Sequence, residues 1–231
     1  MNVPSVAISP DIFGHKPGLF LLFFTEMWER FSYYGMRALL VLFLVSELAG
    51  GGWGWGRAEA LTLYGWYTFL VYVTPILGGI IADKFLGYRR AVLVGAWLMT
   101  LGHLALAFES SSSFYIGLGL LVLGNGFFKP NISSIVGQLY AGEEHRKDSA
   151  YTIFYMGINA GAFLGILFCG YIGEKVGWSL GFGLAGIFMF FGSIMFWLGQ
   201  SIFEGIGRAP TLASRIAESS VVDDTPSNVI R

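Results

Sequence analysis

Long apolar runs, separated by short polar or glycine-rich segments, repeat along the sequence. They predict helices at roughly 18–46, 57–82, 91–108, 114–139, 149–172 and 179–202. Most of these runs reach the length of about 20 residues that an α-helix needs to cross the hydrocarbon core of a bilayer. The pattern therefore predicts an all-α membrane protein, built as a bundle of six transmembrane helices.

The first run carries charged residues in its middle. At about 100° per residue, one helical face collects six polar side chains, Glu26, Glu29, Arg30, Tyr33, Arg37 and, at its edge, Tyr34. A charge at that depth costs at least about 2.5–3.5 kcal/mol on insertion scales, so it needs a partner or a wet cavity. We expect this stripe to face inward and the other face to meet lipid through Leu19, Leu22, Phe23 and Leu40.

Two further polar residues lie deep in later runs. Lys129 lies about ten residues, or roughly 15 Å, from the expected cytoplasmic end of its helix, which is deep for an ammonium group that reaches back to the surface. The next residue, Pro130, removes a backbone donor, and we expect it to interrupt the helix. Asn159 lies near mid-depth in the fifth run, where its amide can bind a ligand or bridge two helices.

The polar segments divide the chain and orient it. We predict a cytoplasmic lead at 1–17, the bundle at 18–202 and a polar cytoplasmic linker or tail at 203–231. Eight Lys and Arg residues near helix ends fall on one side and only Arg57 and Lys175 on the other. The positive-inside rule then places both termini in the cytoplasm. Six helices with both ends inside match half of a common twelve-helix transporter plan.

Composition agrees with a membrane protein and narrows its class. Of the residues, 55% are hydrophobic and 13% charged, against about 25% charged in soluble domains. The net charge of −1 suggests no nucleic-acid partner, and the single cysteine excludes an intrachain disulfide. The 33 glycines are expected where membrane helices approach closely. We find no metal-ligand cluster and no serine or cysteine placed beside a histidine, so we do not expect an enzyme.

The segment 79–90, between the second and third runs, carries glycine, Asp83, Arg89 and Arg90. Asp83 can pair with either arginine or cap a neighbouring helix N-terminus. The pattern resembles the loop between helices 2 and 3 of the major facilitator superfamily, which latches the cytoplasmic side. A solvated positively charged loop is the alternative interpretation.

Three stretches together resemble the proton-dependent oligopeptide transporter family. Residues 26–35 read as its E-x-x-E-R-F-x-Y-Y-G signature without a departure, and 79–90 and 151–163 resemble its two other patterns. The resemblance covers about 15–210 and implies the N-terminal half of a major facilitator fold. It further implies a proton-coupled importer of di- and tripeptides, multi-pass in the cytoplasmic (inner) membrane, with the proton as coupling ion and no other cofactor or metal.

The resemblance also assigns roles to residues. It implies a proton-coupling network formed by Glu26, Glu29, Arg30 and Lys129. It implies a peptide site lined by Tyr33, Tyr34, Arg37, Tyr72, Lys129 and Asn159. Independently, Arg37 and Lys129 can bind a peptide carboxylate, while tyrosines offer hydroxyls and aromatic walls that tolerate varied side chains. We expect Arg30 and Lys129 to take both glutamates, leaving few anions for a peptide ammonium group.

Length is the departure from the family, which has a second six-helix bundle. We therefore expect transport to need such a second bundle, which also supplies the partner for the peptide ammonium group. Two alternatives keep the fold. One is a related carrier of another small solute, because nitrate and plant-hormone carriers also resemble this family. The other is a truncated half without transport activity of its own.

Overall fold

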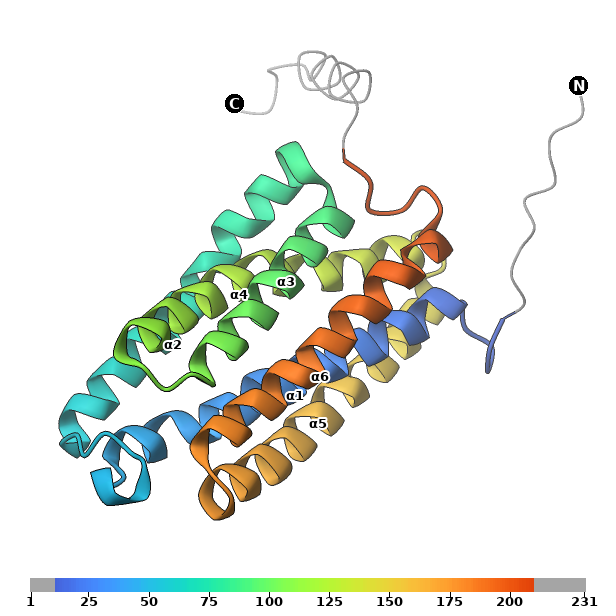
Figure 1. Ribbon diagram of the computed structural model, residues 1–231. Helices are drawn as coiled ribbons and strands as arrows, with labels where there is room; N and C mark the ends of the chain where they lie inside the picture. Colours follow the sequence, from blue (N-terminus) through green and yellow to red (C-terminus); the bar gives the residue numbers. More distant parts are fainter. Residues whose placement is uncertain (1–10, 210–231) are drawn as a thin grey trace, which may run out of the picture.

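The computed structural model describes residues 11–209 and is a helical bundle (Figure 1). Its long helices are α1 (Pro17–Val45), α2 (Arg57–Ile81), α3 (Tyr88–Leu106), α4 (Ser111–Leu139), α5 (Glu144–Lys175) and α6 (Trp178–Gly199). Short helices follow α1, α2 and α6: η1 (Leu48–Gly50), η2 (Ala82–Leu86) and η3 (Gln200–Phe203). The prediction of an all-α bundle is confirmed. The first ten residues of the expected lead and most of the expected tail lie outside the described residues.

Three helix boundaries differ from the predicted ones for local reasons. α4 begins at Ser111 rather than Phe114, because the Ser110 side chain accepts a hydrogen bond from the Ser113 amide and caps the helix. α5 begins at Glu144, inside the segment expected to be a charged loop, and this acidic residue in its first turn suits a helix N-terminus. α3 begins at Tyr88, so Arg89 and Arg90 belong to its first turn.

The expected interruption at Pro130 is wrong, because α4 continues through it. Proline removes one backbone donor, but neighbouring polar side chains can bond to nearby carbonyl groups and limit the cost. The Asn131 amide donates to the carbonyl oxygen of Phe127 at 2.6 Å, and the Ser134 hydroxyl donates to that of Pro130 at 3.0 Å. α2 likewise continues through Pro75.

The six helices form two groups of three. α1 packs chiefly on α5 and α6, α4 packs chiefly on α3 and α2, and the contact between α3 and α6 joins the groups (Figure 1). α1 meets α2 and α4 far less closely, and α4 scarcely meets α5. The groups are therefore joined firmly along one side, and α1 faces α4 with little direct packing.

A row of small residues explains the close packing of α5 on α1. Every fourth residue of α5 is buried and small: Gly157, Gly161, Gly165, Cys169 and Gly173. A Cβ atom added at Gly161 would lie 2.2 Å from the carbonyl oxygen of Met27, and one at Gly165 would lie 2.2 Å from that of Phe31. The α1 backbone thus lies directly on α5, as expected for membrane helices that pack through small residues.

The expected lipid face of α1 is wrong. Leu19, Leu22 and Leu40 are fully buried, and Phe23 is half-buried. At about 100° per residue, Leu19, Leu22 and Leu40 lie on the same face of α1 as Glu26, Glu29 and Tyr33, and they belong to the hydrophobic core. These leucines therefore continue the inward-facing side of α1 beyond the charges and do not form a separate face toward lipid.

The large exposed apolar side chains lie elsewhere, notably on α2 and α5. They include Trp66, Phe69, Leu70, Ile76 and Leu77 of α2, and Met156, Phe163, Ile166, Leu167 and Phe168 of α5. Within the described chain, four segments are long and apolar enough to cross a membrane: Arg57–Leu86, Ser111–Leu139, Glu144–Lys175 and Trp178–Phe203. The 29-residue α1 is long enough too, but it carries the internal charges.

Ion pairs fasten the start of α1 to the connection between α4 and α5. Lys16 pairs with Glu143 at 2.6 Å, and Arg146 pairs with Glu143 at 2.8 Å and with Asp11 at 2.7 Å. The hydrogen bond from Lys16 lowers the pKa of Glu143, outside the membrane-spanning part. These contacts hold the N-terminal end of α1, the helix that carries the polar stripe, against the connection between α4 and α5.

The α1–α5 contact gives a stability prediction. We expect Gly161→Ala to destabilise the bundle by about 1–3 kcal/mol, the usual cost of overpacking, because the new methyl group would meet a backbone carbonyl. Gly170→Ala is the matched control on the same helix, because no atom lies within 4 Å of its added Cβ. Thermal unfolding in detergent measures both, and equal melting temperatures would contradict the packing described.

Candidate functional site

The centre of the polar stripe is a buried cluster of three charges on α1. Glu26, Glu29 and Arg30 are at most 2% exposed. Arg30 Nε lies 3.2 Å from Glu26 Oε1, and the same guanidinium group forms two hydrogen bonds with Glu29, one of them 2.6 Å from Nη2 to Oε1. One arginine therefore neutralises parts of both carboxylates, and the cluster carries one net negative charge when all three groups are ionised.

The two carboxylates differ in how they are satisfied. Both oxygens of Glu29 accept hydrogen bonds from Arg30. Glu26 Oε2 is buried and has no hydrogen-bond partner among residues 11–209. Since a buried carboxylate oxygen without a partner is costly, Glu26 is the carboxylate better placed to hold a proton.

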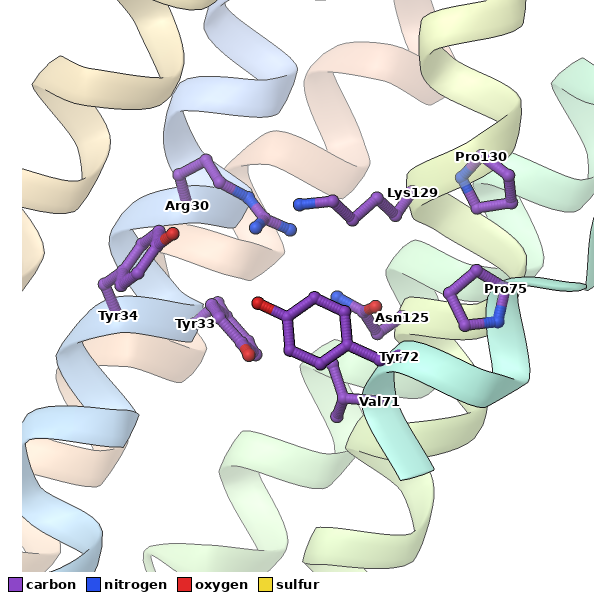
Figure 2. Close-up of a pocket in the computed structure, with 9 residues that line it drawn as sticks. All are labelled: Arg30, Tyr33, Tyr34, Val71, Tyr72, Pro75, Asn125, Lys129 and Pro130. Carbon is purple, nitrogen blue, oxygen red and sulfur yellow. The ribbon is translucent and has the colours of Figure 1, made fainter. Parts of the chain in front are cut away.

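A cavity of about 220 Å³ lies beside this cluster, between α1, α2 and α4 (Figure 2). Its lining residues are Arg30, Tyr33, Tyr34, Val71, Tyr72, Pro75, Asn125, Lys129 and Pro130. Figure 2 shows the side chain of Lys129 extending from α4 toward the guanidinium group of Arg30 on α1. The cavity thus opens where the two helix groups face each other.

Lys129 does not pair as expected. Its side chain is exposed, and within the described part of the chain it forms no ion pair with Glu26 or Glu29, both of which contact Arg30. The reason is proximity along the helix, because Arg30 reaches carboxylates one and four residues before it on its own helix. Lys129 therefore presents its positive charge to the cavity.

Three tyrosines form much of the remaining wall. Tyr33 is 4% exposed and its ring lies under Arg30, with 4.9 Å from the guanidinium carbon to the ring centroid. Tyr34 packs edge-on against Tyr33, with ring centroids 5.2 Å apart. Tyr72 projects from α2 and is 69% exposed. The wall combines aromatic surface with hydroxyl groups, which suits a solute with both apolar and polar parts.

Two residues expected in the peptide site, Arg37 and Asn159, are not among the residues that line the cavity. Arg37 donates hydrogen bonds to the hydroxyl of Tyr64, one at 2.9 Å from Nε, and so ties α1 to α2. Asn159 is exposed on α5, and its amide donates to the carbonyl oxygen of Tyr155 at 3.1 Å in its own helix. Neither lines the cavity in this structure.

The sequence interpretation gave no role to Asn125, which the structure places in the cavity wall. This residue is 1% exposed, and both polar atoms of its amide lack a hydrogen-bond partner in the described chain. Leaving such a group unpaired costs about 1–3 kcal/mol. The available signal was its spacing, because Asn125 lies four residues before Lys129 and so on the same face of α4.

The expected pairing within the segment 79–90 is absent from the described residues. Asp83 forms no ion pair there with Arg89 or Arg90, and it lies beside the hydroxyl of Tyr88. Arg89 instead donates to the carbonyl oxygens of Gln200 at 2.8 Å and Glu204 at 2.9 Å. The helix-terminal carbonyl groups attract this cation, so Arg89 ties the start of α3 to the end of α6.

The helical architecture, the four membrane-length segments and the cavity with charged residues define a multi-pass membrane helix bundle with a polar internal site. Comparison with known proteins gives its family. The pattern of the POT family matches residues 89–222, so the chain belongs to the POT family, the proton-dependent oligopeptide transporters.

Two individual relatives are also described as transporters. The chain is 48% identical over 185 residues to a Bacillus subtilis protein described as an uncharacterized transporter, YclF, covering 80% of this chain and 38% of that one. It is 44% identical over 203 residues to a di-/tripeptide transporter of Lactococcus lactis, covering 86% of this chain and 41% of that one.

The fold has a solved counterpart. The crystal structure of a peptide transporter POT in complex with sulfate superposes with a TM-score of 0.84 at 43% identity, covering 95% of this chain and 46% of that chain. This match shows half of a major facilitator fold. The chain thus spans less than half the length of each of these three proteins.

The buried charge cluster gives a second prediction. We expect Arg30→Met to destabilise the bundle by about 3–5 kcal/mol, because it leaves two buried carboxylates without their cation. The triple variant Arg30→Met, Glu26→Gln, Glu29→Gln removes all three charges and should recover much of that loss. Thermal unfolding of purified protein compares them, and an Arg30→Met variant as stable as the unsubstituted chain would contradict the assignment.

Proposed function

We propose that this chain supplies one of two six-helix bundles of a proton-coupled symporter that carries di- and tripeptides into the cytoplasm. It lies in the cytoplasmic membrane with both termini inside, and the proton is the only coupling ion. Sequence similarity to a di-/tripeptide transporter supports the cargo, and the distribution of Lys and Arg supports the orientation.

One observation carries the proposal. The cavity presents the ammonium group of Lys129, without an ion-pair partner among the described residues, beside an arginine and three tyrosines. A cation in a membrane interior is costly unless an anion neutralises it. A peptide carboxylate is such an anion, and tyrosine hydroxyls can bind the peptide's polar groups while the rings accept varied side chains.

Proton coupling follows from the same cluster. When Glu26 or Glu29 takes up a proton, Arg30 keeps only one negatively charged partner. Its positive charge can then attract an anion in the cavity. A bound peptide carboxylate is then favoured, and by linkage a bound carboxylate favours protonation. The unpartnered oxygen of Glu26 is the atom best suited to receive that proton.

A second bundle completes the transporter in this proposal. The exposed apolar faces of α2 and α5 offer a surface for it, and the thinly packed side between α1 and α4 needs a facing wall. Alternating access is a rocking of one bundle against another around a central site, so a single bundle has no partner to rock against.

The test uses this chain joined to the part of the Lactococcus lactis transporter that lies outside its match, here called the joined transporter. We expect saturable, proton-driven dipeptide uptake into proteoliposomes by the joined transporter and none by the 231-residue chain alone. Uptake by the single chain would contradict the need for a second bundle. Uptake of another small solute with no competition by dipeptides would contradict the cargo.

The coupling role has its own test. In the joined transporter, we expect Glu26→Gln or Glu29→Gln to abolish uptake driven by a proton gradient while retaining part of peptide counterflow, because exchange need not reset the proton site. Glu47→Gln, in the exposed turn after α1, is the matched control and should leave both modes intact. Full driven uptake by both glutamine variants would remove the proton role. A parallel loss of both modes would indicate a structural role only.

A further inference from the structure

The unexplained feature of the cavity is the side chain of Asn125. Its amide is almost fully buried, yet neither its oxygen nor its nitrogen bonds to any other described residue. Figure 2 shows the amide pointing from α4 toward α1, in the same direction as Lys129, with Tyr33 and Tyr72 before it. A side chain with one strong acceptor and two donors is thus kept ready for a partner that the bundle does not supply.

Its position relative to Lys129 indicates what that partner is. The two residues are four apart on α4, so at 1.5 Å per residue their backbones are separated by about 6 Å along the helix axis. A solute whose carboxylate meets Lys129 therefore has its adjoining backbone within reach of Asn125. In a peptide, the group next to the terminal carboxylate is the last peptide bond.

We propose that Asn125 recognises the C-terminal peptide bond of the cargo, with its Oδ1 accepting a hydrogen bond from the peptide N–H. This inference rests on the proposed function, and it makes Asn125 a specificity-determining residue in addition to the expected site residues. An amide is the natural complement of a peptide bond, because each offers an N–H donor and a carbonyl acceptor.

The cavity wall contains a side chain that can move. Tyr72 lines the cavity together with Asn125 and is 69% exposed, and exposed side chains change rotamer on the picosecond to nanosecond timescale. By contrast, Val71, which also lines the cavity, is 4% exposed. A rotation of Tyr72 thus alters the wall of the cavity that Asn125 lines without moving a helix.

A pair of nearly identical ligands isolates the proposed bond. Glycylglycine and 5-aminolevulinic acid share the amino group, carbonyl and carboxylate, but the second has CH₂ where the first has the peptide N–H. Competition of each against a labelled dipeptide on the joined transporter gives a preference ratio. A substitution that only distorts the site changes both affinities, so the ratio reports the contact to the N–H.

We expect the unsubstituted joined transporter to bind glycylglycine about five- to tenfold more tightly than 5-aminolevulinic acid, the value of one hydrogen bond. Asn125→Leu and Asn125→Ala should both bring this ratio close to one. Ser133→Ala removes a polar group from α4 outside the cavity and should leave the ratio unchanged. Two substitutions are tested at Asn125 so that misfolding of one variant does not decide the result.

Two results would overturn the inference in different ways. If the unsubstituted protein binds glycylglycine and the Asn125 variants keep its preference ratio, Asn125 does not read the peptide N–H and the proposed function survives. If the unsubstituted protein binds neither ligand while it remains folded and monodisperse, the proposed function fails and this inference fails with it.

Discussion

The ion cluster of Glu26, Glu29 and Arg30 is the interaction on which the rest of this bundle depends. Three charges inside a helix of a membrane bundle are tolerable only because one guanidinium group forms ion pairs with both carboxylates at once. That pairing is local to α1, so it forms without help from another helix. A helix that carries these charges must also be shielded from lipid. The close packing of α5 and α6 against α1 shields one side of it. The row of small residues on α5 is the device that brings the backbones together.

Because Arg30 takes both glutamates, the fourth charge of the site stands alone. Lys129 approaches from α4, across the side where the two helix groups pack least, and it has no carboxylate within ion-pair distance in the described chain. The site thus separates a cluster in which Arg30 pairs with both carboxylates from a cation without an ion-pair partner. Had Lys129 taken one of the two glutamates, as the sequence suggested, the cavity would offer a peptide carboxylate no cation without an ion-pair partner. Because Arg30 pairs with both glutamates and Lys129 pairs with neither, the ammonium group of Lys129 can attract an anion into the cavity.

The sequence predicted the helices and much of the cavity wall, and its errors have physical causes. Periodicity placed the polar stripe on one face, and Tyr33, Tyr34, Tyr72 and Lys129 all line the cavity. Leu19, Leu22 and Leu40 were expected to meet lipid but are buried, because at about 100° per residue they fall on the same inward-facing side of the helix as the stripe. Periodicity could not foresee that Arg37 would be held by Tyr64, because that contact depends on how α2 lies against α1. The spacing of four residues from Lys129 was the one sequence signal for Asn125, and its lack of a hydrogen-bond partner, a three-dimensional property, could not be read from the sequence.

The same cavity contains two kinds of polar group that need something from outside the bundle. Lys129 lacks an anion and Asn125 lacks a hydrogen-bond partner, and they lie one helical turn apart on one face of α4. A monovalent inorganic anion would satisfy the first and leave the second unpaired. A solute with a carboxylate next to an amide satisfies both, because it gives an anion to Lys129 and a hydrogen-bond partner to the buried Asn125. This asymmetry favours peptides over simple anions without any contact to a peptide side chain, which is consistent with a carrier that accepts many sequences.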